Sequence, residues 1–173
     1  MSAVAATRLA LPVLAAERPR DAALVEGLIA RAFGPGRFAK AAERLRETST
    51  PILALSFLAW SDGEAVGCVR QWRVTIGGAP AVLLGPFAVE NASRRQGLGA
   101  ALIRQACEAA GQAGEALIIL VGDEPFFGPL GFSAAPARRV RMPGPVDQRR
   151  VLVRELVSGA AADLSGPVRA IAA

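Results

Sequence analysis

The segment SRRQGLGAALI, residues 93–103, contains residue types that could bind a phosphate group. Arg94 and Arg95 place positive charge directly before Gly97 and Gly99, and an apolar run follows. The first turn of a helix offers unpaired N–H groups and the positive end of the helix dipole, which together attract anions. Glycine there lacks the Cβ that would keep a phosphate away from the backbone. The segment is therefore predicted to bind a pyrophosphate at a helix N-terminus.

Three elements must position this segment. Residues 81–89 form an apolar strand before it, and apolar residues at helical spacing predict a helix over 97–113. Residues 116–121 form a compact apolar run after a glycine, which is typical of a strand buried on both faces. This order predicts a β-α-β unit with two parallel strands and a right-handed crossover.

The rest of the chain predicts helices and antiparallel strands around that unit. Helices are expected over 21–33 and 38–47, a helical turn over 125–132, and strands over 52–60, 65–76 and 150–156. The Ala- and Gly-rich tail from Ser158 is expected to be loosely packed. The predicted fold class is α/β with a mixed sheet, in a single domain that spans residues 1–173.

Composition limits the classes of function. The 173 residues are 52% hydrophobic and 20% charged, which favours a folded domain, and no apolar run is long enough to span a bilayer. Cys68 and Cys107 lie in apolar segments without CxxC spacing, so buried free thiols in a reducing cytoplasm are expected. The net charge is +5, but the short arginine clusters lack interleaved aromatic residues. Nucleic acid is therefore not the expected partner, although a basic nucleic-acid-binding domain stays open as an alternative.

Two residue types are missing. The chain has no histidine and no tyrosine. Histidine is the side chain whose ordinary pKa lies near neutrality, so a His-based catalytic triad and a His metal site are excluded, and no metal is expected.

The order of the segments LGPFAV, RRQGLGAALI, ALIILVGD and FFGPLGF resembles the GNAT superfamily of N-acetyltransferases, and a bacterial subgroup of it. Residues 94–99 match its Q/R-x-x-G-x-G/A motif. The resemblance covers about residues 17–157 and is strongest over 84–132. It implies a GNAT-type fold of mostly antiparallel strands with a central parallel pair, and acetyl-CoA as cosubstrate. It also implies transfer of the acetyl group to an amine, on a small molecule or a protein, by direct attack.

The resemblance also implies a CoA-binding site. Main-chain groups of residues 95–100 would bind the pyrophosphate, and those of residues 87–89 the pantetheine arm. Phe126 and Phe127 would flank the arm near the sulfur, with core packing as the alternative for both. The implied residues are Phe87, Ala88, Val89, Arg94, Arg95, Gln96, Gly97, Leu98, Gly99, Ala100, Phe126 and Phe127. The acceptor would sit between helices 21–33 and 38–47 and the loop 138–150.

The catalytic residues stay unassigned. Many family members protonate the departing thiolate with a tyrosine where this chain has Phe127. Asp123 is the best-placed carboxylate for a base, with a turn cap as its alternative, whereas Glu90 and Glu124 are expected to be surface charges. Water could do both jobs. A catalytically weak or inactive acyl-CoA-binding module is therefore the alternative function, and a homodimer is left open.

Overall fold

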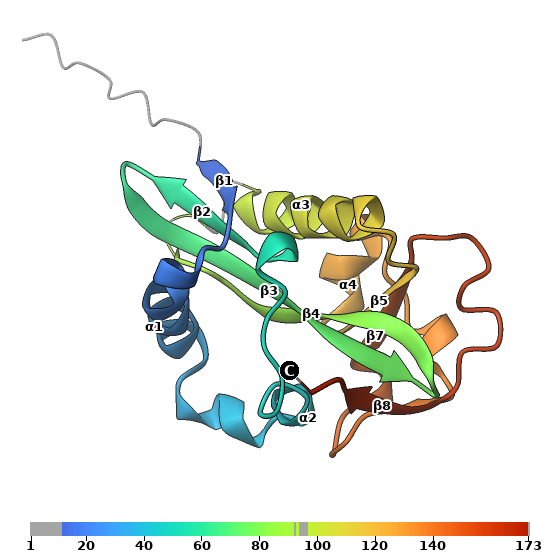
Figure 1. Cartoon of the computed structure of the whole chain (residues 1–173). Helices are drawn as coiled ribbons and strands as arrows, with labels where there is room; N and C mark the ends of the chain where they lie inside the picture. The colour runs from blue at the N-terminus through green and yellow to red at the C-terminus, as the bar shows by residue number, and fades with distance from the viewer. Residues whose placement is uncertain (1–11, 92, 94–96, 173) are drawn as a thin grey trace, which may run out of the picture.

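The computed structural model describes residues 12–91, 93 and 97–172, and it shows one twisted sheet with helices on both faces (Figure 1). The main path of the eight-stranded sheet runs β1-β2-β3-β4-β5-β7, and β8 pairs with β3 and β6. The strands are β1 (Val13–Ala16), β2 (Phe57–Ser61), β3 (Glu64–Ile76), β4 (Ala79–Val89), β5 (Leu117–Val121), β6 (Val140–Arg141), β7 (Val151–Glu155) and β8 (Gly166–Ala170).

The strand directions confirm the predicted mixed sheet. Neighbours along the main path are antiparallel except β4 and β5, which are parallel and joined by a long helix. The short pair of β6 and β8 is also parallel. The α-helices are α1 (Ala22–Phe33), α2 (Ala41–Arg44), α3 (Leu98–Gln112) and α4 (Glu124–Phe127). Single 3₁₀ turns are η1 (Pro19–Asp21), η2 (Pro35–Ala39), η3 (Leu53–Leu55), η5 (Gly128–Leu130), η6 (Ala135–Ala137) and η7 (Gln148–Arg150).

Alternation along the two parallel strands creates a core on each side of the sheet. On β4, Val82 and Leu84 pack on the α3 side, whereas Leu83 belongs to the core on the opposite side. On β5, Ile118 and Leu120 follow the first pattern, while Leu117 and Ile119 follow the second. Successive side chains of a strand point to opposite faces, so both strands must be apolar throughout. The prediction that residues 116–121 form a strand buried on both faces is confirmed.

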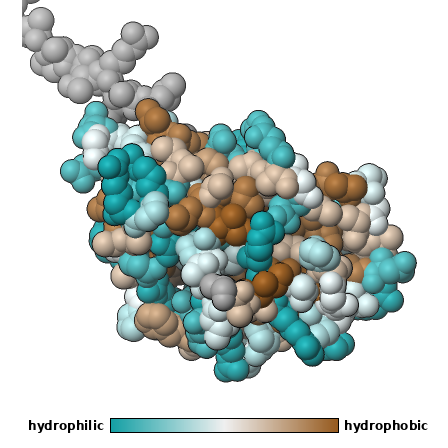
Figure 2. Space-filling view, in the orientation of Figure 1, coloured by the Kyte–Doolittle hydropathy of each residue, from teal (hydrophilic) through white to brown (hydrophobic). Residues whose placement is uncertain are grey.

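Figure 1 shows α3 on one face of the sheet and α1 and α2 on the other. The helix α1 packs through Val25, Leu28 and Ile29, which are at most 2% exposed, in a third cluster of buried residues. On the face shown in Figure 2, apolar residues lie in small areas separated by hydrophilic ones.

Three local predictions need correction. The expected strand 52–60 begins only at Phe57, because residues 53–55 turn as η3 and the buried Ser56 hydroxyl donates to the carbonyl of Ile52. The expected helix 38–47 is shorter, because Lys40 has extended backbone between η2 and α2. The tail is not loosely packed throughout, since β8 pairs with β3 and its Val168 is 3% exposed.

A buried ion pair fastens α1 to the sheet. Arg70 on β3 donates to both carboxylate oxygens of Glu17 and, at 2.6 Å, to Glu26 on α1. The side chains of Arg70 and Glu17 are 7% and 1% exposed. Glu26 also accepts from Arg37 in η2, at 2.9 Å. The network therefore ties β3, α1 and η2 together.

We expect Arg70→Met to destabilise the fold strongly. It leaves the Glu17 carboxylate buried without its cation, which typically costs about 3–5 kcal/mol in the free energy of unfolding. Urea unfolding of the variant measures this loss. The matched control is Arg31→Met on α1, since Arg31 is 61% exposed and pairs with Glu90, which is 36% exposed. Its loss should stay within about 1 kcal/mol, and equal losses for both variants would contradict this account.

Both cysteines are free and buried, as expected. Cys68 is 0% exposed and Cys107 is 2% exposed. Burial raises the pKa of Cys68 from 9.0 to about 12, and it also raises the pKa of Cys107. Both side chains therefore remain thiols at neutral pH, and a thiol is a poor nucleophile.

We expect neither thiol to react with a disulfide reagent in the native protein at pH 8, whereas both should react after unfolding. The folded-state pKa of Cys68 is raised, so its contribution to stability is complete below pH 9 and is lost as pH rises towards 12. Reagent titration in buffer and in denaturant measures the first effect, and urea midpoints between pH 8 and 11 measure the second. Rapid labelling of folded protein would contradict the expected burial, and single Cys→Ala variants would identify the reactive thiol.

Candidate functional site

The site begins where β4 leaves β5. The two strands pair at Val82–Ile118 and Leu83–Ile119, and β4 then continues to Val89. Directly after this pairing, the register between β3 and β4 shifts between Val69–Phe87 and Gln71–Leu84. Two residues of β4, Gly85 and Pro86, therefore oppose a single residue of β3. Such a bulge bends its strand and strengthens the local twist, which turns β4 away from β5.

The two bulge residues suit this place. Gly85 has φ +121°, a conformation that L side chains rarely adopt. Pro86 has no N–H to donate to a ladder. The indole nitrogen of Trp72 donates to the carbonyl of Gly85 at 2.6 Å, which holds the bulge against β3.

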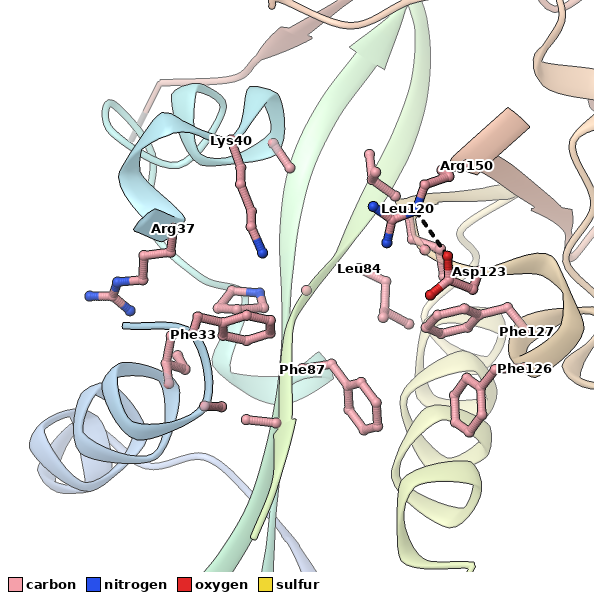
Figure 3. A pocket seen from close by; sticks show the side chains of 18 of the residues that line it. Phe33, Arg37, Lys40, Leu84, Phe87, Leu120, Asp123, Phe126, Phe127 and Arg150 are labelled. Atoms are coloured by element: carbon pink, nitrogen blue, oxygen red, sulfur yellow. Dashed lines mark hydrogen bonds and ion pairs between the residues drawn. The ribbon is translucent and has the colours of Figure 1, made fainter. Parts of the chain in front are cut away.

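A cavity of about 770 Å³ lies at this separation. Residues of β4 and the end of β5 form its floor, α1, η2 and α2 form one wall, and α3, α4 and residues 145–150 form the other. Figure 3 shows β4 crossing between two groups of side chains, Phe33, Arg37 and Lys40 on one side and Asp123, Phe126, Phe127 and Arg150 on the other.

The two glycines at the start of α3 have different roles. Gly97 is the N-cap residue with φ +72°, and among the described residues a Cβ there would meet nothing within 4 Å. It supplies the left-handed turn and leaves the space beside the helix end open. A Cβ on Gly99 would lie 2.9 Å from the tip of the Phe87 ring and 3.5 Å from that of Phe126. Gly99 therefore allows the two aromatic rings to approach the helix.

The other predicted residues of this loop and helix lie in different environments. Ala100 lines the cavity beside Gly97 and Gly99, whereas Leu98 is 4% exposed and anchors α3 in the core. Arg94, Arg95 and Gln96 lie outside the described residues.

Four phenylalanines gather at the α3 end of the cavity. Phe87 and Phe126 stack with their centroids 6.0 Å apart, and Phe127 meets Phe126 edge-on at 4.8 Å and Phe132 at 5.8 Å. Phe126 is 42% exposed and lines the cavity, which does not fit core packing. Phe127 is 9% exposed. It packs in the core and also lines the cavity, so its position is compatible with core packing and with a place beside a CoA arm. Gly122 makes room for its ring, because a Cβ there would collide with it.

The edge of β4 beyond the bulge faces the cavity. The N–H of Glu90 donates to the carbonyl of Val66, so these two residues form a hydrogen-bonded pair of the antiparallel ladder. Because such pairs alternate, Ala88 directs its main-chain groups to β3, opposite Cys68, and Phe87 directs its own to the open edge. Phe87, Ala88 and Val89 all line the cavity.

Each carboxylate that lines the cavity is paired with an arginine. Glu43 accepts from Arg46 at 2.9 Å and Asp123 from Arg150 at 3.0 Å, and Asp147 pairs with Arg149 at 2.8 Å. The hydrogen bond from Arg149 holds the pKa of Asp147 below its usual range. Burial lowers the pKa of Arg46, and Glu43 opposes that shift.

The three carboxylates considered in the sequence analysis, Asp123, Glu90 and Glu124, have different surroundings in the structure. Asp123 is the N-cap residue of α4, and its carbonyl accepts the N–H groups of Phe126 and Phe127. The predicted cap position is therefore found, but the carboxylate makes no capping hydrogen bond and pairs with Arg150 instead. Glu90 pairs with Arg31, and Glu124 accepts the N–H of Ala134, so neither belongs to the cavity lining.

Sequence reasoning missed the charged residues on the α2 side. Lys40, Glu43 and Arg46 line the cavity, yet they follow no motif. These side chains reach the cavity because η2 and α2 fold back over β4. No local sequence pattern predicts that η2 and α2 contact β4. The wall they form does coincide with the acceptor position expected between the first two helices and the loop 138–150.

The described part of the chain shows neither a candidate membrane span nor a metal-ligand cluster. No helix there is long and apolar enough to cross a membrane. No group of three or more Cys, Asp and Glu residues in the same part of the chain could hold a metal ion.

Comparisons with known proteins agree with this geometry. The model of the acetyltransferase (GNAT) domain family matches residues 54–134. The uncharacterized N-acetyltransferase YhbS of Escherichia coli is 28% identical over 155 residues, which are 88% of this chain and 92% of that protein. The crystal structure of E. coli YhbS in complex with CoA superposes with a TM-score of 0.79 at 27% identity, covering 94% of this chain and 91% of that one.

A second solved structure is similar over most of its length. It is a GNAT family acetyltransferase from Brucella melitensis in complex with acetyl-CoA, with a TM-score of 0.59 and 29% identity. The alignment covers 88% of this chain and 98% of that one. The family model over residues 54–134, the E. coli relative and the two CoA-bound structures together support the GNAT superfamily of acetyltransferases as the family of this chain.

Proposed function

We propose that this protein is an acetyl-CoA-dependent N-acetyltransferase that acts on an amine by direct attack. The observation that carries the proposal is the cavity at the separation of β4 and β5, with the N-terminus of α3 at one end and a charged wall at the other. A pantetheine arm is long and thin, and it needs such a channel between two strands. The residues that line the cavity fit both a CoA arm and an acceptor.

The pyrophosphate of CoA would bind at the N-terminus of α3. The left-handed Gly97 leaves open space there, and the first turn of a 15-residue helix directs unpaired N–H groups and a partial positive charge towards it. Arg94, Arg95 and Gln96 belong to the proposed site by family resemblance, with Leu98 and Ala100 in the same turn.

The pantetheine arm would lie along the open edge of β4. The main-chain groups of Phe87 point to that edge, where an added extended segment can bond as a further strand does. Ala88 and Val89 complete the β4 side of the channel, and the rings of Phe126 and Phe127 stand opposite. These contacts would orient the thioester in the middle of the cavity.

Acetyl-CoA supplies an activated acetyl thioester, and the chain must deprotonate the amine and stabilise the leaving thiolate. Four cationic side chains line the cavity, Arg37, Lys40, Arg46 and Arg150. Nearby positive charge lowers the pKa of an ammonium group and stabilises a thiolate. We infer that this field and solvent water replace the acid and base that other family members supply. The buried thiols leave no role for an acyl-cysteine.

The alternative is an acyl-CoA-binding module with little or no catalysis. Phe127 favours it, because a phenyl ring cannot protonate a thiolate. Thiol release from acetyl-CoA with a panel of amines separates the two functions. Release that depends on the amine supports the enzyme, and CoA binding without release supports the module.

Two further expectations accompany the proposal. The pair of free buried thiols fits a reducing compartment, and we propose the cytoplasm. We also propose that residues 1–173 form one domain, because β1 and β8, near the two ends, both join the central sheet.

We expect Gly99→Glu to weaken CoA binding by about 100-fold or more. A side chain at this position displaces the rings of Phe87 and Phe126, and its charge repels the pyrophosphate. Titration calorimetry with CoA measures the loss. Gly99→Gln separates bulk from charge and should give an intermediate loss. Gly111→Glu is the control, since Gly111 lies near the far end of α3 with nothing within 4 Å of a Cβ. Undiminished affinity in Gly99→Glu would contradict the proposed site.

We expect Phe127→Tyr to increase turnover a few-fold below about pH 8, because a thiol has a pKa of roughly 8.5 and gains from protonation there. Figure 3 shows the Phe127 ring directed from α4 towards β4, so a tyrosine hydroxyl would enter the cavity. Thiol release against pH, for both proteins with one acceptor, measures the change. Phe132→Tyr is the control, since Phe132 is 1% exposed in the core. An unchanged rate would mean that thiolate departure is not the limiting step.

A further inference from the structure

The wall of the cavity opposite α3 has a charge pattern that bears on the acceptor. We call it the acceptor half, and it comprises Phe33, Lys40, Glu43 and Arg46. Its carboxylate, Glu43, is already bound to Arg46, whereas both of its cations keep hydrogen-bond donors without a partner among the described residues.

Lys40 is the first of these cations. Figure 3 shows its side chain extending into the cavity, while Arg37 points away and pairs with Glu26. The ammonium of Lys40 lies 4.5 Å from the centroid of the Phe33 ring. Within the described ranges, no carboxylate forms an ion pair with it. An ammonium against an aromatic face keeps its other donors for a ligand.

Arg46 is the second. Its side chain is 12% exposed, and Nη1 donates to Glu43. Nε is buried without an acceptor among the described residues, which leaves the guanidinium incompletely satisfied. Nη2 lies 3.1 Å from the place that a Cβ on Gly85 would take, beside the bulge of β4. This cation therefore stands at the point where the two strands separate.

A molecule with a second positive charge has no carboxylate to meet in this half. Glu43 is held by Arg46, and the two side chains are 17% and 12% exposed. Across the cavity, Asp147 and Asp123 pair with Arg149 and Arg150 at more exposed positions. Breaking the Glu43–Arg46 pair to bind a cation would leave a nearly buried arginine without its partner, which is costly. An oxyanion instead meets the exposed ammonium of Lys40 and the nearly buried guanidinium of Arg46.

We propose that the acceptor is a small amine that also carries a carboxylate or another compact oxyanion, which Lys40 and Arg46 bind while the amino group faces the thioester. This inference rests on the proposed acetyltransferase function.

The first test compares matched amines with wild-type protein. Phenylalanine is paired with phenethylamine, glycine with methylamine, and phosphoethanolamine with ethanolamine, and putrescine and a lysine-rich peptide represent cationic acceptors. We expect kcat/KM for the anionic member of at least one pair to exceed that of its partner about tenfold, the usual effect of one charge-assisted hydrogen bond. The pair that shows the difference identifies carboxylate or phosphate as the anion.

Variants then test whether Lys40 and Arg46 cause the preference for anionic amines. Lys40→Met should lower kcat/KM for the anionic amine about tenfold more than for its uncharged partner, and Lys40→Glu should shift the preference towards putrescine. Arg46→Lys keeps the charge of a nearly buried residue and should also lower kcat/KM for the anionic amine. Arg20→Met removes an exposed cation in η1 outside the cavity and should change nothing.

A binding measurement keeps the result independent of turnover. With CoA present, calorimetry follows the binding of the two N-acetylated products of the pair that shows the kinetic difference to wild type and Lys40→Met. Tighter binding of the anionic product that is lost in the variant supports the proposal. Faster turnover of putrescine or the uncharged amines, or equal binding of the two products, overturns it and leaves the acetyltransferase function intact. If no amine releases thiol and neither product binds, the proposed function itself fails.

Discussion

The separation of β4 from β5 depends on how one strand is paired along its two edges. After Leu83, β4 loses its parallel partner on one edge, while the bulge at Gly85 and Pro86 changes its register on the other. A backbone edge left without a ladder must be satisfied by water or a ligand. In this fold that edge becomes the wall of a binding cavity, and the hydrogen bond from Trp72 to Gly85 keeps the bend in place. The aromatic cluster, the end of α3 and the charged wall are all arranged around it.

Close packing between glycines and phenyl rings shapes the end of that cavity where we propose that CoA binds. Gly99 lets Phe87 and Phe126 reach α3, and Gly122 leaves space for Phe127. The rings are held by contacts with backbone, and such contacts allow little adjustment. Small residues at these two positions therefore determine the width of the channel as much as the phenylalanines do.

Electrostatics define the other end. The arginines neutralise the cavity carboxylates and leave an excess of positive charge close to where the amine and the thiolate would be. A chain without histidine or tyrosine can still favour a neutral amine and an anionic leaving group in this way, because the charged wall acts without transferring a proton. The Arg70 network holds α1 and η2, and with them this wall, against the sheet.

The sequence by itself determined the β-α-β unit and the helix that follows the glycines, because each of these is a local pattern. The residues proposed to bind CoA came from the resemblance to the GNAT superfamily. Helical spacing over 98–112 and the continuous apolar run of β5 report burial directly. Strand β8 and the break between η2 and α2 escaped prediction, because they depend on partners far along the chain. Only the tertiary structure brought Lys40, Glu43 and Arg46 to the cavity and turned the Asp123 side chain to Arg150. Ion pairs between distant segments leave no periodicity in the sequence, so the charge of the acceptor half was decided by packing.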